Sequence, residues 1–144
     1  MGVFLAGLTR WFVSKRTPKA ESFCVERQPG EFKEILTFYL QIGGILVTLA
    51  SGSLVFLVGS SLFKNGQLSW LLASPLFLLA QAVLYVILFM VFMTLNYEHF
   101  KHDSSTYSRP KYVRNQALGF AGVLCFCAGY LWLIFVLTNL SGAT

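Results

Sequence analysis

Three long runs of apolar residues, separated by short polar segments, set the pattern of the chain. Residues 35–63, 68–96 and 117–140 contain no Asp, Glu, Lys, Arg or His. A helix needs roughly 20 apolar residues to cross the ~30 Å hydrocarbon core of a bilayer, and each run is longer than that. In lipid, a helix satisfies all of its own backbone hydrogen bonds. We therefore predict three transmembrane helices at these bounds.

The segment before the first run, residues 1–34, is more polar but begins with a short amphipathic pattern. Phe4, Leu8 and Trp11 recur at intervals that place them on one face of a helix. Pro18 ends this pattern, because proline cannot continue a helix. The predicted fold is an all-α integral membrane protein, in which a short interfacial amphipathic helix precedes the three transmembrane helices.

The basic residues are distributed unevenly, and this distribution predicts an orientation. Of the eleven Lys and Arg residues, all but Lys64 lie before the first run or between the second and the third. The positive-inside rule places residues 1–34 and 97–116 on the cytoplasmic side, or on the matrix side of a mitochondrion. The tail, residues 141–144, then lies on the opposite side. The pattern fits a bacterial inner membrane and an organelle membrane equally well.

The segments between the runs are short. Residues 64–69 form an outer loop with an Asn-Gly turn, so the first two transmembrane helices are expected to be antiparallel neighbours. Residues 97–116 form a longer basic loop on the cytoplasmic side. Neither segment is long enough to form a separate domain.

The composition agrees with a membrane protein and indicates the partners of its polar ends. Hydrophobic residues make up 56% of the chain and charged residues 12%, against about a quarter charged in soluble domains. The net charge of +5 is gathered at one side, and no nucleic-acid-binding motif accompanies it. We expect the basic residues to contact lipid head groups or a soluble partner rather than nucleic acid. The candidates are Lys15, Arg16, Arg109, Lys111 and Arg114.

Small residues recur every four positions in two of the three runs. Such stripes allow close approach of helix backbones, which is how helices associate where lipid competes with apolar side chains. We expect the two stripes to pack against each other or against another chain. The stripe in the first run contains Gly44, Thr48 and Gly52, and the stripe in the third contains Ala117, Ala121, Cys125 and Gly129.

Polar side chains within the runs are few, and no catalytic motif accompanies them. Gln41 and Gln81 are expected to hydrogen-bond across helices or, in an oligomer, to line a water path. His99 and His102 share a helix face, but they follow the second run directly, where a solvated polar end is expected. We predict no metal site, no cofactor and no enzymatic activity.

The function predicted from these features is that of a small, non-catalytic structural or assembly subunit of a larger integral membrane complex. Its partners would be the lipid bilayer and other integral membrane subunits. A second hypothesis is a homo-oligomeric membrane effector or pore-forming protein of the toxin or defence type, built from copies of this chain. A third hypothesis is a component of a channel or transporter.

Overall fold

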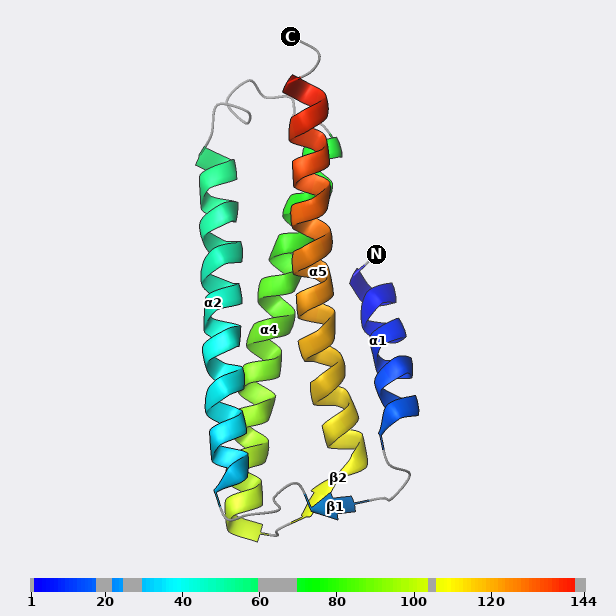
Figure 1. Ribbon diagram of the computed structural model, residues 1–144, viewed down its shortest axis with the longest axis vertical. Helices are drawn as coiled ribbons and strands as arrows, with labels where there is room; N and C mark the ends of the chain where they lie inside the picture. The colour runs from blue at the N-terminus through cyan, green and yellow to red at the C-terminus, as the bar shows by residue number, and fades with distance from the viewer. Residues whose placement is uncertain (1, 18–21, 25–29, 60–69, 104–105, 142–144) are drawn as a thin grey trace.

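The computed structural model describes residues 2–17, 22–24, 30–59, 70–103 and 106–141, and these residues form a bundle of helices (Figure 1). The predicted outer loop, residues 64–69, and residues 142–144 of the tail lie outside the described residues. In chain order the elements are α1 (Gly2–Arg16), β1 (Ser22–Cys24), α2 (Glu31–Gly59), α4 (Trp70–Asp103), β2 (Thr106–Ser108) and α5 (Arg109–Ser141).

Three of the described helices are long and apolar enough to cross a membrane. They cover Glu31–Gly59, Ala73–His102 and Arg109–Asn139, which confirms the prediction of three long apolar helices. Each continues beyond its apolar run at the basic end, so most of the segment 97–116 is helical rather than a loop. An apolar run marks where a helix can meet lipid, whereas the backbone hydrogen bonds of the helix continue equally well into water.

Local sequence explains where two of these helices begin. Gly30 directly precedes α2 with a φ of +93°, a conformation that favours glycine, and its carbonyl oxygen accepts a hydrogen bond from the amide of Glu34 at 3.3 Å. Glu31 and Glu34 lie in the first turn, where the helix dipole favours negative charge. In α5, Pro110 occupies the first turn, where a proline costs no helical hydrogen bond.

Helix α4 is the centre of the bundle. It packs along α2 on one side and along α5 on the other, whereas α2 and α5 touch each other only slightly. Near the end away from the strands, Ser53 and Tyr130 hydrogen-bond through their hydroxyl groups, and the Tyr130 hydroxyl also donates to the Leu49 carbonyl oxygen at 3.3 Å. Toward the strands, cavities are lined by residues of both α2 and α5.

Helix α1 lies along the first half of α5 and runs antiparallel to it (Figure 1). The Thr9 hydroxyl donates to the Ala117 carbonyl oxygen at 3.2 Å, and the Arg109 guanidinium donates to the Ser14 carbonyl oxygen at 3.0 Å. The sequence correctly predicted a helix here. Its direction differs from that of an interfacial helix, which would lie across the bundle axis. The reason is the second face of α1, where Thr9 and Val13 are buried, as is Thr17 directly after the helix.

A two-stranded antiparallel sheet joins the segment before α2 to the segment before α5. In β1 and β2, Ser22 pairs with Ser108 and Cys24 pairs with Thr106. The fold is almost entirely helical, as predicted, and this short sheet is an element that the sequence analysis did not predict. Strands of three residues leave little periodic signal in a sequence, and their pairing depends on two helix ends that meet only in the folded chain.

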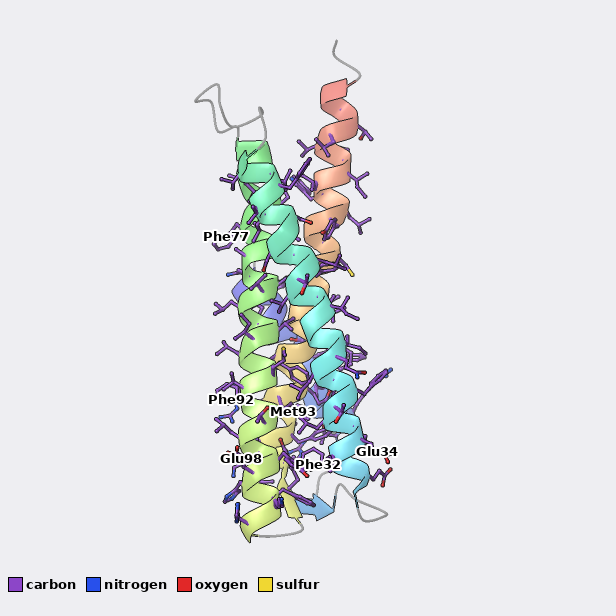
Figure 2. The ribbon with its side chains drawn as sticks, turned by 90° about the vertical axis from the view of Figure 1, so that its left-hand side faces the viewer. Phe32, Glu34, Phe77, Phe92, Met93 and Glu98 are labelled. Carbon is purple, nitrogen blue, oxygen red and sulfur yellow. The ribbon has the colours of Figure 1, made fainter. Side chains whose placement is uncertain are left out.

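The core of the described residues contains three clusters, and one of them joins Leu78 and Ala82 of α4 to Cys125 of α5. Away from the strands, Ala50, Leu57, Leu79, Leu133 and Val136 pack together. Toward the strands the cluster is aromatic and includes Phe32, Met93 and Tyr107. Figure 2 shows Phe32 and Met93 between α2 and α4, whereas Phe77 and Phe92 lie on the side of α4 turned away from α2. The exposed apolar side chains of all three long helices suit contact with lipid.

Candidate functional site

The two predicted small-residue stripes do not meet. The stripe of α5 is buried within the bundle. Ala121 and Cys125 are fully buried, and Cys125 packs with Leu78 and Ala82 of α4. A methyl group added at Gly129 would lie 3.1 Å from Leu79. Ala117, at the start of the stripe, accepts the hydrogen bond of Thr9 through its carbonyl oxygen. The α5 stripe therefore packs against α4 and α1, not against α2.

The stripe of α2 faces away from the rest of the chain. A methyl group added at Gly44 or at Gly52 would meet no atom within 4 Å among the described residues. Thr48, between them, is exposed and donates to the carbonyl oxygen of Gly44 at 2.9 Å. Its hydroxyl is thereby satisfied within α2. The stripe is therefore a shallow surface on which the Thr48 hydroxyl already has a hydrogen-bond partner. A second apolar helix can approach such a surface closely.

Glycines outside the predicted stripes mediate the close packing on α4. A methyl group at Gly43 would lie 2.8 Å from the Met90 sulfur, and one at Gly122 would lie 2.7 Å from the side chain of Val86. Gly119 similarly meets Phe89 at 3.3 Å. Of the two adjacent glycines, Gly43 and not Gly44 of the predicted stripe contacts α4. Adjacent glycines give no sign in the sequence of which one faces a neighbouring helix.

The two glutamines predicted within the membrane are apart. Gln41 is exposed on α2, whereas Gln81 is half-buried on α4 and its Oε1 has no hydrogen-bond partner among the described residues. Gln41 is close in sequence to Gly43, which contacts Met90 of α4. Met90 is nine residues from Gln81, which is roughly 14 Å along a helix. The fold does not bring these amides together within one chain.

The predicted basic residues have distinct surroundings. Lys15 and Arg16 lie over the rings of Trp11 and Phe12, at 4.0 and 4.5 Å from the ring centroids. Arg114 is exposed and lies 4.2 Å from the centroid of Phe92. Lys111 is half-buried, and Arg109 bonds the backbone of α1 through its guanidinium. All lie toward the end of the bundle that carries the strands, and Arg109 has a structural contact that its sequence position did not indicate.

A buried polar group lies among the aromatic residues of this end. Asn115 is 1% exposed, and its side-chain amide donates to the Tyr107 hydroxyl at 2.7 Å. Its Oδ1 is buried with no partner among the described residues. Burial raises the pKa of Tyr107 to about 12, although the hydrogen bond with Asn115 acts in the opposite direction. The sequence analysis missed this pair, since Asn115 lies at the polar edge of its apolar run.

Three adjoining cavities lie along α2 and α5, and all three are lined by Tyr39 and Gln116. Residues of α1 line the largest of them, and residues of α4 line the other two. The largest, about 410 Å³, lies beside α1 and is also lined by Arg16 and Thr17. The second, about 180 Å³, extends along α2 and α5 and has mainly apolar walls. The third, about 100 Å³, is lined by Tyr107 and Asn115. We call this set of three cavities the α1–α2–α5 hollow.

Neither the side-chain chemistry of the described residues nor comparison with known proteins assigns a function to the hollow. Within the described ranges, no three side chains of the His, Cys, Asp and Glu types come close enough to hold a metal ion. Comparison of the chain with protein-family models, curated proteins and solved structures finds no match.

Proposed function

We propose that this chain is a small non-catalytic subunit of a larger integral membrane complex, and that it binds a partner helix through the outer face of α2. The observation that carries the proposal is the open stripe of Gly44, Thr48 and Gly52. The small residues of α5 contact the chain's own helices, whereas the small-residue stripe of α2 meets no counterpart among the described residues.

The burial of the helices supports the choice of α2. In its most apolar 18-residue window, 17% of the residues are buried, against 33% in each of the other two long helices. Its exposed side chains include Ile45, Leu49 and Val55, which border the stripe. An apolar helix gains little by exchanging lipid for another apolar surface, unless close backbone approach adds dispersion contacts. Gly44 and Gly52 permit that approach.

The orientation belongs to the same proposal. In this orientation the basic end, with the strands, faces the cytoplasm or the matrix, and the end of α5 at Asn139 faces the opposite side. The partner helix would lie along α2 within the bilayer and would leave the basic end accessible.

The test is purification of the tagged protein from its native membrane in mild detergent, followed by native mass spectrometry. We expect other membrane proteins in stoichiometric amounts with the unchanged chain, and their loss with Gly52→Leu. The matched control is Ala80→Leu, which introduces the same leucine side chain at an exposed small residue of α4. Retention of the partners by Gly52→Leu would overturn the proposed interface.

The homo-oligomeric effector gives a different result in the same experiment. A discrete cluster of this chain alone, dispersed by Gly52→Leu, would replace the subunit proposal with self-assembly through α2. Leakage of a fluorescent dye from vesicles that contain the purified chain would then distinguish a pore former from a closed cluster.

A further inference from the structure

The α1–α2–α5 hollow is polar and cationic at one end and apolar at the other. At its wide end, Arg16 of α1 and the adjacent Thr17 lie across from Tyr112 and Gln116 of α5. Along the narrower part the walls are Ile42, Leu46, Phe120 and Val123 among others. No Asp or Glu lines any of the three described cavities. A ligand that fits this gradient carries a negative charge at one end and a hydrocarbon chain at the other.

Arg16 is placed to bind an oxyanion. Its guanidinium lies over the ring of Phe12 at 4.5 Å from the centroid, and both residues line the wide cavity. Stacking uses the face of the guanidinium and leaves the N–H groups at its edge available to bond a phosphate. Lys15, next in sequence, instead lies over the ring of Trp11 at 4.0 Å from the centroid and does not line the cavity. Both residues belong to the end of the bundle that the charge distribution assigns to the anionic leaflet.

We propose that the α1–α2–α5 hollow binds one anionic glycerophospholipid from the leaflet at the strand end. Its phosphate lies at Arg16 with the Gln116 amide nearby, and one acyl chain follows α2 and α5 past Phe120 and Val123. A transmembrane helix, about 10 Å across with its side chains, is too wide for a cavity of about 180 Å³. A free phosphate would leave the apolar walls empty.

This site is separate from the proposed partner surface. The hollow is lined by Gly43 and Tyr39 on the inner side of α2, whereas Gly44 and Gly52 have open space before them. Lipid binding at the hollow and helix binding at the stripe therefore succeed or fail independently.

The experiment measures lipid binding by native mass spectrometry of the full chain in mild detergent. Phosphatidylglycerol and phosphatidylcholine with identical acyl chains are added in turn. We expect one phosphatidylglycerol to bind at least about tenfold more tightly than phosphatidylcholine. Both lipids offer a phosphate to Arg16, but the choline ammonium cancels the net negative charge of phosphatidylcholine and is repelled by the guanidinium. Arg16→Gln should remove most of this preference. Lys15→Gln is the control, because it removes the same charge from the same helix at a residue outside the cavity lining.

A second pair of variants tests the apolar half. Val123 and Leu124 are 40% and 42% exposed on α5, and of the two only Val123 lines the hollow. Val123→Trp should fill the narrow cavity and weaken phosphatidylglycerol binding at least about tenfold, whereas Leu124→Trp should leave it unchanged. Equal binding by all four variants, equal binding of the two lipids, or displacement of the lipid by glycerol 3-phosphate would each overturn the proposal.

Discussion

At the scale of single residues, the glycines of the bundle have two kinds of surroundings. Gly122 faces α4, where an added methyl group would lie 2.7 Å from the Val86 side chain and 3.4 Å from its backbone nitrogen. Gly52 faces open space. The same substitution therefore has opposite consequences at the two positions.

We expect Gly122→Ala to destabilise the folded chain by about 1–3 kcal/mol, because Val86 is stiff and must shift together with α4. Gly52→Ala should leave stability unchanged or raise it slightly, since alanine favours the helix. Unfolding of the two variants in detergent, followed by circular dichroism against denaturant, measures both effects. Equal stability of the two variants would show that α4 and α5 do not pack at Gly122.

Tyr107 makes the stability of the bundle dependent on alkaline pH. Its pKa is raised from 10.0 to about 12 in the folded chain, chiefly by burial. Because the folded pKa lies above the unfolded one, the stability that the neutral phenol contributes is complete below about pH 10. It is lost as the pH rises through about 12.

Tyr107→Phe should lower stability by about 1 kcal/mol at neutral pH, through loss of the hydrogen bond with Asn115. The difference in stability between Tyr107→Phe and the unchanged chain should narrow between about pH 8 and pH 11. Only the unchanged chain loses the stability that the neutral Tyr107 phenol contributes. Thermal unfolding midpoints at both pH values provide the measurement. The other tyrosines affect both proteins alike, so a constant difference would exclude a special role for Tyr107.

At the scale of elements, α1 depends on a few specific bonds to α5. The Thr9 hydroxyl reaches the Ala117 carbonyl oxygen, and replacement by valine keeps the shape of the side chain while removing this bond. We expect Thr9→Val to weaken the docking of α1 by about 0.5–1.5 kcal/mol. Hydrogen exchange of the α1 amides, followed by mass spectrometry, should accelerate by up to about tenfold.

Thr48→Val is the matched control for this measurement, because the Thr48 hydroxyl bonds within its own helix. It should leave exchange in α1 unaltered. Unchanged exchange in Thr9→Val as well would mean that apolar packing at Val13, and not the hydrogen bond, retains α1 on α5.

At the scale of the whole molecule, the strands bring the N-terminal segment and the segment between α4 and α5 to one end. Lys33 and Lys111 both lie toward this end, and Asn139 lies toward the other end of α5. We expect Lys33→Cys and Lys111→Cys to react with a membrane-impermeant maleimide from the same side, and Asn139→Cys from the opposite side. The variants are made in a chain without its native cysteines.

The comparison is made on sealed membrane vesicles of known orientation. Labelling of Lys33→Cys and Lys111→Cys from opposite sides would contradict both the orientation and the sheet that joins the two segments. Their labelling from the non-cytoplasmic side together would reverse the orientation and leave the fold intact.

The accuracy of sequence-based prediction varied with the type of feature. The three apolar helices were predicted well, because charge-free runs longer than the bilayer is thick have few alternative explanations. The extension of α4 to Asp103 was missed, since hydropathy does not register helical turns in water. The Asn115–Tyr107 bond and the α1–α2–α5 hollow join residues from separate elements, and no local pattern marks them.

The sequence by itself determined which segments are apolar helices and which end of the molecule is basic. Only the tertiary structure decided which faces pair: the α5 stripe packs on α4, Gly43 rather than Gly44 contacts Met90, and α1 lies along α5. The physical reason is the solvent. In water a buried helix face is recognised by its apolarity, but lipid is as apolar as a protein interior, so the lipid-facing and protein-facing sides of a helix look alike until they are packed.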